Sequence, residues 1–186
     1  MSCKLTVSKT NSCSKKAKQG GLDTTMWLFN LEEGGEITAY TEAVEGVVTG
    51  ITLPTGATLK RVDTEKYANS FSHSFERPSL NSFFPQIVNI VAITDDAADL
   101  QWYVETLRAD KLGAIVKDTN GQFKILGQYA GLRGNTGDGY SSGNEQGAEV
   151  GSMILLDGAE TTHPFKFLDL GSTKLTQDYL QSLEAV

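Results

Sequence analysis

The sequence predicts a mainly β protein: a β-sandwich or partial barrel with one flanking α-helix, long β-hairpins and extended arms. Strand-like stretches outnumber helical ones, with about eight to ten of the former and one of the latter. Only 39% of the 186 residues are hydrophobic, and 19 are glycine, a composition that suits strands joined by long connections. The length suits one domain, which we place at 22–170, between a basic arm at 1–21 and a C-terminal arm or short helix at 171–186.

The N-terminal half begins with three predicted strands. Residues 24–31 alternate and carry aromatic side chains, and 36–44 form a second such run after the turn sequence Glu-Glu-Gly-Gly. Two strands joined by a turn of this kind predict a β-hairpin. Residues 47–54 form a short apolar run that ends at Pro54.

A long polar strand region is predicted within 59–78, and its alternation is regular from Tyr67 onward. Small polar residues occupy one face, so we expect this strand to lie in an extended sheet with one face in water. His73 is interpreted as a packing residue on the aromatic face. One face carries Tyr67, Asn69, Phe71, His73 and Phe75, and the other carries Ala68, Ser70, Ser72, Ser74 and Glu76.

Residues 85–94 predict a buried strand, and 95–113 predict the one dependable helix. Asp95 or Asp96 is expected to cap its start, because a carboxylate there accepts hydrogen bonds from the first amides. Gly113 is expected to end the helix. The predicted apolar stripe consists of Leu100, Tyr103, Val104 and Leu107.

The clearest hairpin is predicted at 114–127, because Asn120-Gly121 provides the positive φ angles that a tight turn needs. Residues 149–160 and 164–170 predict two more strands or one hairpin. The last residues, 173–186, form either an arm or a short amphipathic helix. That helix would use Leu175, Leu180 and Leu183.

Charge argues against a protein that grips DNA, because 23 acidic residues outnumber 16 basic ones and the net charge is -7. Residues 1–20 carry five lysines and no acid, so the remainder carries -7 minus 5, or -12. The basic start is either a solvated tail or an arm that docks on a neighbouring copy. In the second case Lys15 and Lys16 are expected interface residues.

Cys3 and Cys13 lack metal-type spacing, and we expect no disulfide framework from them. The sequence shows no apolar run near the roughly 20 residues needed to span a bilayer and no secretory leader pattern. We therefore expect a protein of a reducing compartment, neither exported nor bound to a membrane.

The glycine-rich stretch Gly131–Gly151 is interpreted as a polar connection of roughly seventeen residues between strands. It contains a G-x-S-x-G match around Ser141, with Asp157 and His163 downstream. A nucleophile elbow needs a strand, a strained turn and a helix, and turn residues surround Ser141 instead. A phosphate-binding loop would need a G-K-[ST] end, and a calcium loop a different acid spacing.

The sequence therefore predicts no catalytic residue, cofactor or metal. Long connections are usually functional, so we expect this one to contact a partner. The expected contact residues are Asn135, Asp138, Tyr140, Asn144 and Glu145.

The block from "LGAIVKDTNGQFKILGQYAGL" through "EVGSMILLDGAE" to "PFKFLD" resembles the C-terminal half of tail tube and related virion proteins of tailed bacteriophages. The early "GEITAY" and the long polar strand region are similar as well, so the resemblance covers about 22–170. The family has no catalytic residues.

The resemblance implies hexameric rings that stack through loops and arms, with inner sheets joined into a continuous channel for DNA ejection. The expected partners are further copies of the chain and other tail proteins, with DNA only as passing cargo. The protein would be made in the host cytoplasm and reside in the virion tail. A net-acidic body suits such a channel, because like charge keeps DNA from adhering. Asp63, Glu65 and Glu76 are expected lumen residues.

Three other functions remain open at this stage. A ring-forming tail terminator, connector or contractile-system tube would share the sandwich. A ligand-binding β-sandwich could use Trp27, Trp102 or Tyr140 as an aromatic platform, and an enzyme is the remaining alternative.

Overall fold

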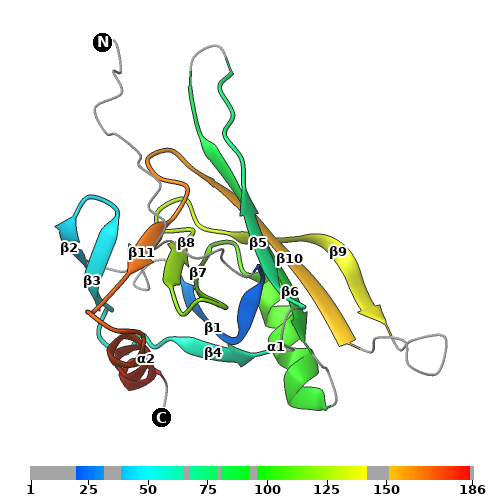
Figure 1. Cartoon of the computed structure of the whole chain (residues 1–186). Coiled ribbons are helices and arrows are strands. Elements are labelled where there is room, and N and C mark those ends of the chain that lie inside the picture. Colours follow the sequence, from blue (N-terminus) through cyan, green and yellow to red (C-terminus); the bar gives the residue numbers. More distant parts are fainter. Residues whose placement is uncertain are drawn as a thin grey trace.

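The computed structural model describes residues 20–31, 39–64, 68–78, 81–92, 96–141 and 151–184, which form two β-sheets and two helices (Figure 1). The mainly β prediction is confirmed. A seven-stranded sheet has the order β2-β3-β11-β8-β7-β1-β4, and a four-stranded sheet has the order β5-β6-β10-β9. The pairings are antiparallel except for β11 with β3, and neither sheet closes into a barrel. The elements are β1 (Leu22–Asn30), β2 (Ala39–Val44), β3 (Val47–Thr52), β4 (Lys60–Asp63), β5 (Ser70–His73), β6 (Phe84–Ala92), α1 (Ala97–Arg108), β7 (Leu112–Asp118), β8 (Phe123–Leu126), β9 (Arg133–Ser141), β10 (Gly151–Glu160), β11 (Lys166–Leu168) and α2 (Thr173–Ser182).

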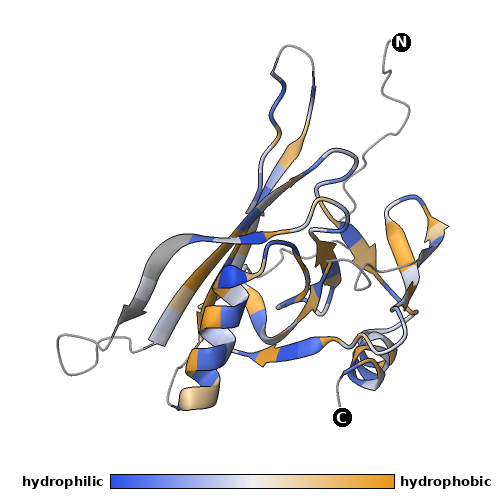
Figure 2. Cartoon of the chain, turned by 180° about the vertical axis from the view of Figure 1, so that it is seen from behind, coloured by the Kyte–Doolittle hydropathy of each residue, from blue (hydrophilic) through white to orange (hydrophobic). Residues whose placement is uncertain are grey.

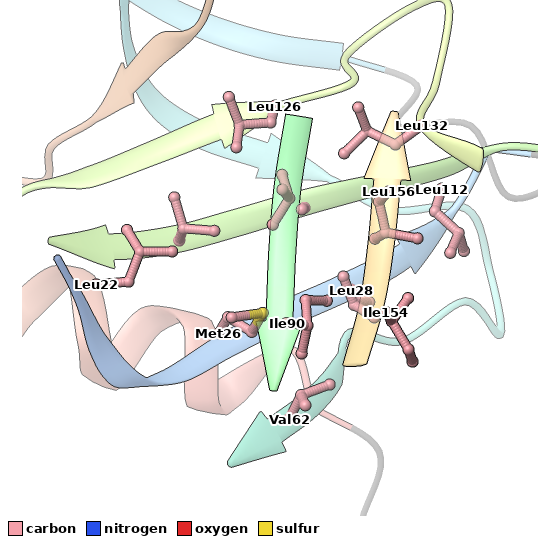
Figure 3. Close-up of a cluster of buried hydrophobic side chains, with 13 residues drawn as sticks. Leu22, Met26, Leu28, Val62, Ile90, Leu112, Leu126, Leu132, Ile154 and Leu156 are labelled. Carbon is pink, nitrogen blue, oxygen red and sulfur yellow. The ribbon is translucent and has the colours of Figure 1, made fainter. Parts of the chain in front are cut away.

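The main core lies between the two sheets. Figure 3 shows side chains of β6 and β10 lying over those of β1, β4 and β7. Every second residue of these strands points inward, as the pleat requires. Met26 and Leu28 of β1 meet Ile90 of β6 and Ile154 of β10 there, and all four are nearly or fully buried. Burial of this kind contributes roughly 1.5–3 kcal/mol per large apolar side chain.

A second core covers the other face of the seven-stranded sheet. It contains Trp27 of β1, Ile115 of β7 and Leu180 of α2, each with no exposed surface. Because β1 and β7 contribute to both cores, the centre of this sheet is apolar on both faces. By the described part of the chain, the four-stranded sheet has only its inner face covered in this way.

Helix α1 begins as predicted but ends earlier. The Asp96 carboxylate caps it by accepting hydrogen bonds from the amides of Ala98 and Asp99, at 2.8 and 2.9 Å. The helix ends at Ala109, which is extended, so the prediction that Gly113 ends it is wrong. Gly113 lies in β7 opposite Phe29, and an added Cβ would come within 2.0 Å of the Phe29 ring. That glycine serves close packing rather than a helix cap.

The buried side of α1 also differs from the predicted stripe. Trp102, Tyr103 and Leu107 pack against the main core, whereas Leu100 is 55% exposed. In Figure 2 hydrophilic and hydrophobic residues alternate along α1, as expected of a helix with one buried side. The C-terminal turn of α1 lies against β9 at Gly134. The side of the helix that faces the core therefore does not include Leu100.

The predicted hairpin between the first two strands is wrong. Strand β1 pairs with β7 and β4, and β2 pairs with β3 through a turn at Gly46. Alternation shows that a segment forms a strand, but the partner depends on contacts far along the chain. The hairpin of β7 and β8 is confirmed, with Gly121 at φ +80°.

The predicted long strand within 59–78 is two strands in different sheets. Strand β4 pairs with β1, and β5 pairs with β6. Asn69 marks the change of sheet, because its buried side-chain oxygen accepts a hydrogen bond from the Val91 amide at 2.9 Å. The predicted division of faces in β5 is confirmed for Phe71, which is half-buried, and for Ser70 and Ser72, which are exposed. His73 is exposed, and its ring lies 5.5 Å from that of Phe165.

The interpretation of Gly131–Gly151 as one long connection is also wrong in its first half. Residues 133–141 form β9, which pairs with β10. The glycines misled the prediction, because Gly normally weakens a strand. Here Gly134 lets the Leu107 backbone of α1 approach closely, since an added Cβ would lie 2.6 Å from its carbonyl oxygen. At the C-terminus, α2 confirms the helical alternative, with Leu180 buried and Leu175 57% exposed.

Candidate assembly interface

The four-stranded sheet presents an outer face that no described element covers. Burial alternates along β6 and β10, so the positions between the buried residues point outward. The outward side chains mix small polar, amide and apolar groups. They are Ser70 and Ser72 on β5, Ile87, Asn89 and Val91 on β6, Met153, Leu155 and Asp157 on β10, and Arg133 and Asn135 on β9.

The strand registers arrange these residues in rows across the sheet. One row runs Ser70, Asn89, Leu155, Asn135, and the next runs Ser72, Ile87, Asp157, Arg133. The Arg133 Nε atom lies 3.8 Å from Asp157 Oδ1, and Asn135 donates a hydrogen bond to Asp157 Oδ2 at 2.9 Å. The described part of this face is therefore weakly charged, and the ion pair of Arg133 with Asp157 lies within the chain.

Both edges of this sheet are open within the described residues. Strand β5 pairs with β6 alone, and β9 pairs with β10 alone. The β5 ladder continues past its last residue, because Ser74 and Glu76 also donate backbone hydrogen bonds, to Pro85 and Phe83. The two hairpins project toward opposite ends of the sheet (Figure 1). Open edges of this length template pairing with another chain.

The structure separates the predicted lumen residues. Asp63 ends β4 in the seven-stranded sheet, where its Oδ1 atom accepts from Arg61 Nε and Thr25 Oγ1, both at 3.0 Å. Glu76 lies on the extension of the β5–β6 hairpin and has the same facing as Ser70 and Ser72. Glu65 lies outside the described residues.

Among the predicted contact residues, Asn135 lies on the outer face and is exposed. Asp138 and Tyr140 belong to β9, although their side chains lie outside the described part. The remaining four predicted contact residues lie outside the described residues altogether. They are Lys15, Lys16, Asn144 and Glu145.

The G-x-S-x-G match does not assemble a triad. Ser141 pairs with Gly151 and Arg133 pairs with Asp157 at the other end of the same ladder. Six residues of β10 separate these rows, which corresponds to about 20 Å. His163 instead has its Nε2 atom 3.5 Å from Glu45 Oε1.

Of the aromatic residues considered for a ligand-binding protein, the structure describes the side chains of Trp27 and Trp102, whereas the side chain of Tyr140 lies outside the described part. Trp27 is fully buried and donates a hydrogen bond to Glu184 Oε1 at 2.7 Å. Trp102 lines an open groove of about 500 Å³ between α1 and β4, together with Glu105 and Leu59. The two rings therefore belong to different environments.

Two ion pairs that involve buried lysines connect segments of the chain. Burial disfavours the charged form of Lys166, but hydrogen bonds with Glu42 and Tyr129 outweigh it and raise the pKa of Lys166. The Lys166 hydrogen bond in turn lowers the pKa of Glu42. Burial raises the pKa of Tyr40, whose ring lies 5.7 Å from the Lys166 ammonium. These groups fasten β2 to β11 across β3.

Asp118 and Lys124 form the second pair, with 2.7 Å between Asp118 Oδ2 and Lys124 Nζ. Burial favours the neutral acid, but the hydrogen bonds from Lys124 and the Gln122 and Asn120 amides prevail and lower the pKa of Asp118. The pair therefore stabilises the β7–β8 turn, and the Asp118 carboxylate has hydrogen-bond partners for both of its oxygens.

No group of three or more potential metal-ligating side chains occurs in the described part of the chain. Within the same part, neither helix is long and apolar enough to cross a membrane.

The prediction from sequence missed the edge strand β9 and the outward side of β10. In β10 the outward Met153 and Leu155 are as apolar as the buried Ile154 and Leu156, so no alternation was visible. The sequence also did not show that β6 is the strand that pairs with Ser70 and Ser72, because strand pairing depends on residues far apart in the sequence.

Searches for similar proteins agree with one another: no protein-family model, curated protein or solved structure matches this chain.

Proposed function

We propose that this chain is the structural subunit of a bacteriophage tail tube, which assembles into stacked six-membered rings around a channel for DNA. The observation that carries the proposal is the four-stranded sheet, which, among the residues that the structure describes, has one covered face, one open face and two open edges. The sequence resemblance to tail tube proteins supports the same function.

The strand directions allow identical copies to join edge to edge. All pairings in the four-stranded sheet are antiparallel, so β5 and β9 run in opposite directions. A β5 strand placed beside the β9 strand of a neighbour therefore continues the antiparallel pattern. Such a contact is head-to-tail, and it forms a ring when the rotation closes. Closure also removes the exposed edges.

The open face would then line the channel. Its described charged residues are Glu76, Asp157 and Arg133, that is, two acids and one base. The remaining polar groups are short, such as those of Ser70 and Ser72. A face with few cations gives the phosphate backbone of DNA little to bind. The wall is therefore suited to passage rather than retention.

Electron microscopy of the concentrated protein tests the proposal. We expect rings or tubes with an open bore, and tubes of unlimited length distinguish a tail tube from a terminator or connector ring. A protein that stays monomeric at high concentration in sedimentation velocity experiments contradicts the proposal.

A matched pair of variants tests whether the β5 edge forms the contact. Ser74 and Glu76 direct their amides to β6, so the alternation of the ladder directs the His73 amide away from β6. His73→Pro removes that outward donor without breaking a bond to β6, and proline is tolerated on the open side of an edge strand. We expect His73→Pro to fold and remain monomeric, and His73→Ala, which keeps the amide, to assemble. Equal assembly of both variants would exclude this edge.

A further inference from the structure

The two open edges of the four-stranded sheet are displaced relative to each other along the strands. Measured on the shared rows, β5 begins at the row of Ser70 and Asn135 and its ladder extends past the start of β9, as far as Glu76. Strand β9 extends the other way, to Ser141. A neighbour placed flush, with every row continued straight across, would overlap at only three positions: Ser70 with Asn135, Phe71 with Gly134, and Ser72 with Arg133.

The flush arrangement is also blocked at its next position. Leu132 directly precedes β9, and flush pairing would place it opposite His73 of the neighbour. Its backbone amide and carbonyl already bond to Leu112, at 2.6 and 2.7 Å. The edge of the sheet is therefore closed by its own chain before β9 begins, and flush pairing cannot be extended in that direction.

Side-chain facing restricts the remaining registers. Ser70, Ser72 and Glu76 point outward on the β5 edge, and Asn135 points outward on β9. Residues opposite each other in an antiparallel pair face the same side, so the register can change only in steps of two residues. One of the permitted registers places Glu76 opposite Asn135. It lays the edge 70–76 along the edge 135–141, which bulges between Asn135 and Gly139, where four residues of β9 span two of β10.

We propose that neighbouring copies join in this staggered register, with Glu76 of one copy opposite Asn135 of the next. This inference rests on the proposed function, and its partner is a second copy of the chain. The stagger brings the full length of both edges side by side, instead of three positions, and the bulge in β9 lies within the contact. Strands of a closed barrel must tilt, and a fixed stagger between neighbours produces that tilt. The β5–β6 and β9–β10 hairpins extend in opposite directions along the sheet, and this displacement would set the stagger between neighbouring copies in the channel wall.

A series of paired cysteine variants tests the register by disulfide cross-linking. In a Cys3→Ser, Cys13→Ser background, Asn135→Cys is combined in turn with Ser70→Cys, Ser72→Cys, Ser74→Cys or Glu76→Cys. All five positions are exposed. Within one chain Ser70 and Asn135 are three strand spacings apart, about 14 Å, which is beyond the roughly 7 Å limit for a disulfide. Every disulfide in the series therefore reports a contact between copies.

Assemblies are formed under reducing conditions, checked by electron microscopy, oxidised, and separated by non-reducing electrophoresis. We expect the Glu76→Cys pair to give on the order of ten-fold more cross-linked product than the Ser70→Cys pair, because six residues of strand correspond to about 20 Å. The single Asn135→Cys variant serves as the control and should stay uncross-linked.

The outcomes separate the register from the proposed function. Rings or tubes that cross-link best through Ser70→Cys, Ser72→Cys or Ser74→Cys overturn the staggered register and leave the function intact. Assemblies that form without any cross-link overturn the pairing of these edges. A parent protein that forms no ring removes both proposals.

Discussion

The side-chain hydroxyl of Tyr179 takes the place of a β11 partner for Ile51, which pairs with Tyr40 of β2 on its other side. The hydroxyl accepts a hydrogen bond from the Ile51 amide at 2.8 Å and donates one to the Ile51 carbonyl at 2.7 Å. Strand β11 pairs with β3 only at Val47 and Val48, so Ile51 lies beyond the reach of that ladder. The helix α2 thereby completes the backbone hydrogen bonding of β3.

Removal of this hydroxyl should destabilise the fold. In Tyr179→Phe both Ile51 backbone groups lose their partner in a buried position, and we expect a loss of about 2 kcal/mol in the free energy of unfolding. Urea denaturation followed by circular dichroism measures the change. A variant as stable as the parent protein would show that α2 does not dock on β3.

Substitution of the two leucines of α2 should change the free energy of unfolding by very different amounts. Leu180 is fully buried in the second core, whereas Leu175 is 57% exposed. We expect Leu180→Ala to cost about 3 kcal/mol of unfolding free energy, and Leu175→Ala less than about 0.5 kcal/mol. Thermal and urea unfolding of the matched pair test which face of the helix is buried. Similar losses in both variants would contradict the observed orientation.

Gly134 should not tolerate a methyl group. An added Cβ would lie 2.6 Å from the Leu107 carbonyl oxygen and 2.8 Å from its Cα atom, and backbone cannot move aside as a side chain can. We expect Gly134→Ala to cost about 1–3 kcal/mol in urea unfolding.

Gly50→Ala is the matched control for Gly134→Ala. Its added Cβ would meet Thr41 at 3.6 Å, an ordinary contact, so its effect should stay within about 0.5 kcal/mol. Equal stability of the two alanine variants would show that α1 does not pack on β9.

Acidic pH should remove the contribution of the Asp118 carboxylate to the stability of the fold. Its pKa is lowered in the folded protein, so the carboxylate stabilises the fold above the unfolded pKa of about 3.9, and this stability is lost as the pH falls through the lowered value. We expect Asp118→Asn to cost about 3 kcal/mol at pH 7, because it leaves the buried Lys124 ammonium without its partner. The difference from the parent protein should shrink below about pH 4.

Thermal unfolding at pH 7, 5, 4 and 3 measures that difference. A gap of the same size at pH 3 and pH 7 would show that the Asp118 charge contributes nothing. The double variant Asp118→Asn, Lys124→Met removes the unpaired ammonium and should recover part of the loss. The Lys124 position lies against the rings of Phe71 and Phe165, which suit an apolar side chain.

Local features of the sequence were sufficient for several elements. The Asp96 cap, the turn at Asn120-Gly121 and the exposed serines of β5 each depend on a few neighbouring residues. Capping and turn chemistry act over three or four positions, and alternation follows from the pleat. The mainly β fold class and the exposed half of the candidate interface were therefore predictable.

Tertiary structure alone decided which segments meet. It placed Asp63 and Glu76 in different sheets, paired β1 with β7 rather than β2, and made a strand of the glycine-rich segment beside α1. The edge β9, and with it half of the candidate interface, followed from that packing. The physical reason is that strand pairing sums many contacts between residues distant in sequence, whereas alternation and turns are set by the residues themselves.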